Sequence, residues 1–206
     1  MKKIFSMNGG LFRAMTIIYQ VLCLNLLFLL TSFPIVTIGA STVALYHCTL
    51  KIANGDEPAL YRTYMAAFKS NFKQGFVAGL GMLVGALFFF YAIRYALFQK
   101  QPIIVIIMVS LSAIFLFTSE YLFPMLAHYE NQLGAQIRNA LVLSFQNAAL
   151  SIVCFISNAV LIVLFPILLP KLFFLWVFLG VAGAAMINSK IMTHIFQKYD
   201  DTEGQN

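Results

Sequence analysis

Residues 103–127 read IIVIIMVSLSAIFLFTSEYLFPMLA, an apolar run in which Glu120 is the only charged side chain. An α-helix needs roughly 20 such residues to cross a hydrocarbon core of about 30 Å. Similar runs recur along the chain, so that hydrophobic residues make up 61% of its 206 positions and charged residues 10%. A soluble domain carries about 25% charged residues, because it has to cover its surface with them. The sequence therefore predicts an all-α integral membrane protein.

The apolar runs predict a single transmembrane helical domain, 1–206, that is a bundle of about six spanning helices. Its length leaves no room for a second, soluble domain. The first run is too long for a signal peptide and lacks a small-residue cleavage site, which predicts a retained helix. The predicted spans cover residues 14–33, 35–53, 75–97, 103–127, 139–165 and 172–196.

The second predicted span follows a strong interruption of the backbone. Pro34 restrains Phe33 and ends the first helix, and Gly39 permits a tight turn. The apolar run is short for a span if it begins at Ala40, and adequate if it begins at Ile35. Two interpretations follow: a helix that crosses fully, or a partly re-entrant element whose backbone is satisfied by protein or water.

Between the second and third spans, residues 57–74 have an amphipathic pattern. An acidic cap followed by Pro58 predicts the helix start. Basic side chains run beside an aromatic face, as in a helix that lies on the cytoplasmic lipid surface; the alternative is a solvated face with an ordinary packed side. The apolar face comprises Tyr61, Met65, Phe68 and Phe72, and the basic stripe comprises Arg62, Lys69 and Lys73.

The basic residues are distributed unevenly across the predicted spans. Of the 13 Lys and Arg residues, all but Arg94, Lys100 and Lys171 fall on the side of the two termini. Basic residues concentrate in cytoplasmic loops, so both termini are predicted to be cytoplasmic, and the net charge of +6 is no sign of nucleic-acid binding. A five-span alternative would place some of these basic residues outside.

Motifs for catalysis and cofactor binding are absent from the sequence. There is no G-x-x-x-x-G-K-[ST], H-E-x-x-H or G-x-S-x-G, and the histidines and cysteines have no metal or redox spacing. Triads assembled from distant segments would leave no such signature. We expect no enzyme activity, no cofactor and no metal.

Glu120 is the one acidic residue inside an apolar span, where a charge costs at least ~2.5 kcal/mol at mid-depth. Two interpretations follow. Glu120 is either functional, as a proton or ion relay or as a contact to a partner subunit, or it is a carboxyl near the cytoplasmic interface that is hydrogen-bonded or paired with a nearby basic residue such as Arg138. Other polar groups at this depth are expected to join helices by hydrogen bonds, and small residues to mark packing faces. These are the amides Asn25, Asn147, Asn158 and Asn188 and the pairs Gly75–Gly79 and Gly81–Gly85.

Several segments together resemble the YesL-like family of small bacterial membrane proteins. Three stretches carry the resemblance, although family members tend to have Arg where this chain has His128. They are FPIVTIGA at 33–40 with ALY at 44–46, GDE at 55–57 with FKSNFK at 68–73, and FPMLAHYEN at 123–131 leading to RNAL at 138–141.

The resemblance implies a bacterial cell membrane protein of the kind encoded beside carbohydrate ABC importers and polysaccharide-degrading enzymes. It suggests a non-enzymatic accessory component of such an importer, in contact with permease subunits and, as a further candidate, the ATPase subunit. The alternative is an independent small-solute transporter or channel, indicated by Glu120 and the interrupted helix. The candidate structural and partner-contact residues are Pro34, Thr37, Gly39, Arg62, Lys69, Asn71, Lys73, Glu120, Pro124, His128, Glu130, Asn131 and Arg138.

Overall fold

The computed structural model describes residues 10–203, which are almost entirely helical and contain no strand. Six helices in this part of the chain are long and apolar enough to cross a membrane, which confirms an all-α multi-pass membrane protein. The elements are α1 (Gly10–Ser32), a 3₁₀ turn (Ile35–Thr37), α2 (Ile38–Ala53), α3 (Leu60–Ser70), α4 (Phe72–Phe98), α5 (Pro102–His128), α6 (Leu133–Gln146), α7 (Ala148–Asn158), a π-helix (Ala159–Leu164), α8 (Phe165–Leu168), a second 3₁₀ turn (Pro170–Leu172) and α9 (Phe173–Glu203).

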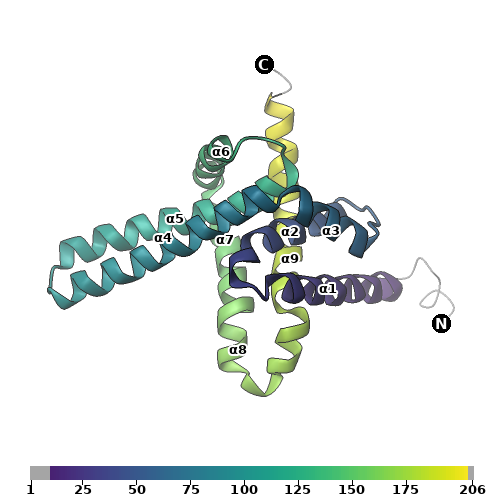
Figure 1. Cartoon of the computed structure of the whole chain (residues 1–206), viewed down its shortest axis with the longest axis horizontal. Helices are drawn as coiled ribbons and strands as arrows, with labels where there is room; N and C mark the ends of the chain where they lie inside the picture. Colours follow the sequence, from purple (N-terminus) through teal and green to yellow (C-terminus); the bar gives the residue numbers. More distant parts are fainter. Residues whose placement is uncertain (1–9, 204–206) are drawn as a thin grey trace.

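The short helix α2 lies at the centre of the structure and packs against α1, α3, α4, α5 and α9 (Figure 1). More than half of its most apolar segment is buried, the largest share among the six apolar helices. A tight turn directly precedes α2, in which the Thr37 amide donates to the Pro34 carbonyl at 2.8 Å. The Thr37 hydroxyl also donates to the carbonyls of Thr31 and Pro34, at 2.6 and 2.7 Å. Pro34 and Thr37 thus fix the angle between α1 and α2.

Glycine lets α2 and α4 meet backbone to backbone. A Cβ placed on Gly39 would lie 2.6 Å from the Cα of Gly79 and would also strike the Gly75 carbonyl. One placed on Gly75 would lie 2.7 Å from the Cα of Ala40. The predicted packing role of Gly75–Gly79 is confirmed. Of the second pair, Gly85 packs on Phe115, whereas Gly81 faces open space.

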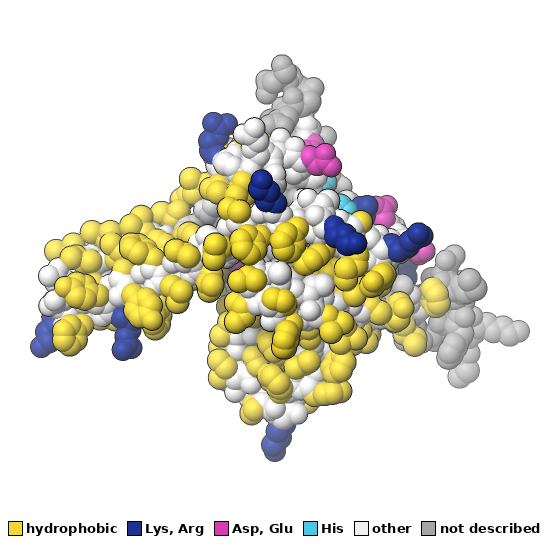
Figure 2. Space-filling model, in the orientation of Figure 1, with side chains coloured by type: hydrophobic (Ala, Val, Ile, Leu, Met, Phe, Trp, Pro, Cys, Tyr) yellow, Lys and Arg dark blue, Asp and Glu magenta, His cyan; other side chains and the backbone are white. Residues whose placement is uncertain are grey.

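Two arms diverge from this centre (Figure 1). One is the hairpin of α4 and α5, and the other is formed by α7, the π-helix, α8 and α9. Both arms are covered by hydrophobic side chains, with basic groups at their free ends (Figure 2). In the most apolar segment of α4 only 6% of the residues are buried, and in that of α5 none is. Such a surface is suited to contact with lipid acyl chains.

The structure differs from the sequence prediction at residues 139–165. Instead of one span, α6 ends at Gln146 and α7 begins at Ala148, because Asn147 adopts a non-helical backbone (φ −116°, ψ 40°). The helix that is apolar enough to span starts at Ala148 and continues through the π-helix to Leu168. Arg138 therefore lies within the separate helix α6.

The predicted amphipathic helix is shorter than residues 57–74. It begins at Leu60, since the backbone is still non-helical at Ala59 (φ −67°, ψ 88°), and it ends at Ser70, before α4. Its buried face is centred on Tyr64 and Ala67, whereas Tyr61, predicted on the apolar face, is 65% exposed. Tyr64 donates to the Ser41 carbonyl at 3.3 Å and its hydroxyl lies 2.7 Å from that of Thr31, which ties α3 to α1 and α2.

Replacing Gly39 by alanine tests the α2–α4 contact. The added methyl group would force the two backbones apart, so we expect Gly39→Ala to lower the free energy of unfolding in detergent by about 1–3 kcal/mol. Gly81→Ala is the matched control, because the same methyl group meets open space there and alanine favours helix by about 1 kcal/mol. Equal stability of the two variants would contradict a close contact.

A cavity between the helices as candidate functional site

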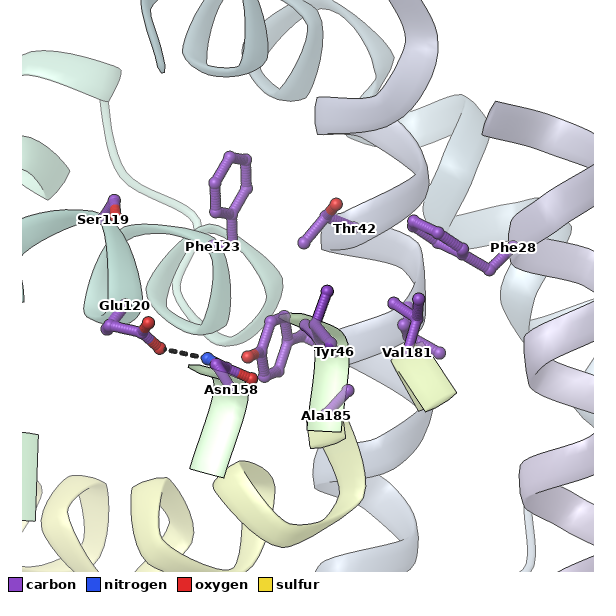
Figure 3. A pocket seen from close by; sticks show the side chains of 11 residues that line it. Phe28, Thr42, Tyr46, Ser119, Glu120, Phe123, Asn158, Val181 and Ala185 are labelled. Carbon is purple, nitrogen blue, oxygen red and sulfur yellow. Dashed lines mark hydrogen bonds between the residues drawn. The ribbon is translucent and has the colours of Figure 1, made fainter. Parts of the chain in front are cut away.

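A cavity of about 320 Å³ opens where α1, α2, α5, α7, the π-helix and α9 converge (Figure 3). Its wall is mainly apolar, with a few polar side chains contributed by α2, α5 and α7. Ligand sites in proteins commonly have this volume and this composition. The lining residues are Phe28, Thr42, Leu45, Tyr46, Ser119, Glu120, Phe123, Asn158, Ile162, Val181 and Ala185.

The carboxylate of Glu120 reaches across the cavity wall to α7. Asn158 Nδ2 donates to Glu120 Oε2 at 2.6 Å (Figure 3). The second carboxylate oxygen, Oε1, has no hydrogen-bond partner among the described residues, and no described basic side chain lies within ion-pair distance. The partner of Glu120 is thus Asn158, and the pairing with Arg138 considered from the sequence is wrong.

The π-helix follows directly after Asn158. In its i→i−5 pattern the Phe165 amide donates to the Val160 carbonyl. The next donor in this register would be residue 166, but Pro166 has no N–H. The indole of Trp176 in α9 donates to the vacant Leu161 carbonyl instead, at 3.0 Å. Wide turns of this kind occur frequently at functional sites, and this one shapes the wall to which Ile162 belongs.

Polar side chains beside the cavity join the helices. Asn25 of α1 donates to the Val177 carbonyl and accepts from the Ala182 amide, at 2.6 and 2.7 Å, which links α1 to α9. Asn188 Nδ2 lies 3.5 Å from the Tyr46 hydroxyl. Three of the four amides predicted to connect helices therefore do so; Asn147 bonds within its own segment, to Leu143.

The remaining candidate residues do not form one site. Asn71 closes α3 through the Ala67 carbonyl and lies where α4 begins, and Pro124 is buried inside α5. The Asn131 carbonyl accepts from Gln74, which connects the 129–132 loop to α4. The others are exposed on several elements: Arg62 and Lys69 on α3, Lys73 on α4, Glu130 in the loop and Arg138 on α6.

His128 belongs to a contact between the ends of α5 and α9. Its ring stacks on Phe196 at a centroid distance of 5.1 Å, and Nε2 lies 3.9 Å from Asp200. The Tyr129 hydroxyl donates to the same carboxylate at 2.7 Å. Asp200 was not a candidate in the sequence, because 71 positions separate it from Tyr129.

Within residues 10–203, no three His, Cys, Asp or Glu side chains gather to hold a metal ion. The polar groups that line the cavity are the carboxyl of Glu120, the amide of Asn158 and the hydroxyls of Thr42, Tyr46 and Ser119. Such a set can bind a ligand or hold a proton.

These features define a multi-pass helical membrane protein with a mainly apolar cavity that contains one carboxyl group. A family model described as "Protein of unknown function, DUF624" matches residues 21–93. The Uncharacterized protein YesL of Bacillus subtilis (strain 168) is 31% identical over 149 residues, which cover 70% of this chain and 69% of that protein. The chain belongs to this YesL-like family, which confirms the resemblance. No solved structure matches it.

A double-mutant cycle tests the bond between Glu120 and Asn158. We expect the replacements Glu120→Ala and Asn158→Ala to be coupled by about 0.6–1.7 kcal/mol, the range of such bonds in membranes. Reversible unfolding in mixed micelles measures it. Glu120→Ala with Thr42→Ala is the control pair, since Thr42 lines the cavity but bonds to Ile38. Additive effects at positions 120 and 158 would show that no bond forms.

Proposed function

We propose that this chain is a non-enzymatic accessory component of a carbohydrate ABC importer, in the bacterial cell membrane with both termini in the cytoplasm. Membership of the YesL-like family supports the proposal, because the resemblance implies a gene neighbourhood with carbohydrate importers. The basic residues support this orientation. Only Arg94, Lys100 and Lys171 lie near the α4–α5 and α8–α9 turns, at the free ends of the two arms, and all other described Lys and Arg residues lie elsewhere. Basic residues concentrate on the cytoplasmic side of a membrane protein.

One observation carries the partner role: the α4–α5 arm presents a long apolar surface that the chain leaves uncovered. On that surface, Gly81 is exposed and its face is open. Small residues let a second helix approach closely within lipid, where packing drives association. A permease helix is the proposed occupant of this face.

The polar end of the molecule offers a second contact. Arg62, Lys69 and Lys73 are exposed on α3 and at the start of α4, and Arg138 is exposed on α6. These cations are suited to acidic groups of a cytoplasmic subunit or to anionic lipid headgroups. The ATPase subunit of the importer is the further candidate at this surface.

Copurification from the native membrane tests the partner role. Tagged chain in mild detergent is expected to recover permease subunits, identified by mass spectrometry. Gly81→Leu should reduce that recovery several-fold, since the new side chain occupies the space for the partner helix.

Ala86→Leu is the matched control, because it adds the same side chain at an exposed position on another face of α4. Recovery without any permease or ATPase subunit would contradict the proposal. Equal loss in the two variants would show that Gly81 does not mark the contact face.

The cavity favours a second candidate, an independent transporter for a small solute. Its support is the carboxylate of Glu120 beside a π-helix at membrane depth. Purified protein in liposomes should then carry a solute inward, and Glu120→Gln should reduce the flux at least about tenfold, as loss of a charged hydrogen-bond partner does. Glu130→Gln is the control, because it removes an exposed carboxylate in the 129–132 loop. Absence of flux for sugars, amino acids and ions would exclude this candidate.

A further inference from the structure

The polar groups that line the cavity around Glu120 are matched to one kind of ligand. The hydroxyl groups of Ser119 and Thr42 donate hydrogen bonds within their own helices, to the carbonyls of Leu116 and Ile38 at 2.6 and 2.8 Å. Their oxygens are therefore left as hydrogen-bond acceptors towards any other group. Two cavity-lining hydroxyls thus offer acceptors.

Asn158 and Glu120, which are hydrogen-bonded to each other, also offer acceptors to the cavity. Asn158 donates through Nδ2 to Glu120, and its side chain also lies within hydrogen-bonding reach of the Tyr46 hydroxyl; its carbonyl oxygen is an acceptor. Glu120 Oε1 has no partner among the described residues. No Lys, Arg or His lines the cavity. Apart from the Tyr46 hydroxyl, the polar groups of the lining offer mainly acceptors, and one of them is a carboxylate, so the cavity favours a ligand that brings both hydrogen-bond donors and positive charge.

The apolar part of the wall decides between an inorganic and an organic cation. Phe28, Tyr46 and Phe123 line the cavity, and aromatic faces attract an ammonium group. Hard metal cations prefer about six or more oxygen ligands, and only five polar side chains line the cavity. The volume of about 320 Å³ also exceeds what a bare ion fills and falls within the range of small-molecule sites.

We propose that this cavity binds a small organic cation, an alkylammonium group whose N–H donors meet Glu120, Ser119 and Asn158 while its apolar body lies against the aromatic and aliphatic wall. Binding requires no covalent step. The inference does not rest on the accessory role, because a ligand can bind here whether or not a permease is present.

Calorimetric titration of the purified protein in maltoside micelles tests the inference. The probes are n-butylammonium chloride, sodium chloride and 1-butanol at neutral pH. Butylammonium is expected to bind saturably, and Glu120→Gln to weaken it at least about tenfold, while Gln at this position can still accept from Asn158. Trp176 is the only tryptophan and bonds to the π-helix, so its fluorescence should change in the same titration.

Two further variants separate binding from folding. Glu130→Gln removes a carboxylate outside the cavity and should leave binding unchanged. Val181→Phe narrows the cavity with Glu120 intact, and should weaken binding although the protein still elutes as folded. Equal binding by Glu120→Gln, equal binding of 1-butanol, or competition by sodium at the same concentration would overturn the inference. Absence of saturable binding would overturn it as well, and would leave Glu120 as a structural partner of Asn158.

Discussion

The backbone contact between α2 and α4 is the constraint on which the structure depends. Gly39, Gly75 and Gly79 allow it, because any side chain at the crossing would separate the helices. One turn beyond Gly39, α2 supplies Thr42, Leu45 and Tyr46 to the cavity. The same close packing that orients the α4–α5 arm therefore also positions the cavity wall, so that the fold and the candidate site share one determinant.

Hydrogen bonding within lipid explains why the polar residues cluster as they do. An unsatisfied polar group costs several kcal/mol in a hydrocarbon environment, so buried amides and hydroxyls seek partners on neighbouring helices. Asn25 is hydrogen-bonded to two backbone groups of α9, and the hydroxyl oxygens of Thr49 and Ser189 lie 2.7 Å apart. Among the described residues, four buried polar atoms have no partner, on Ser41, Gln136, Asn188 and Thr193. Glu120 Oε1 differs from them, because its side chain lines the cavity, where a ligand can reach it.

The sequence predicted the parts of this structure that depend on local composition. The apolar runs located the helices, and the spacing of Gly75 and Gly79 predicted a packing face, because both signals are contained within a single helix. The pairing of Glu120 with Asn158 was not predicted, because 38 positions separate them and only the folded chain brings them together. The break at Asn147 was also missed, since the apolar pattern continues across it and one residue's backbone conformation decides the boundary.

The helices of the two arms are long for a membrane span. α4 and α5 each contain 27 residues, and α9 contains 31. At 1.5 Å per residue these helices measure about 40 Å or more, which exceeds a hydrocarbon core of about 30 Å. Long helices accommodate this excess by tilting. Arms that tilt in different directions leave an apolar flank between them that the chain itself cannot fill. A lipid or a partner helix has to occupy that flank, and α5 takes part both in this arm and in the cavity wall.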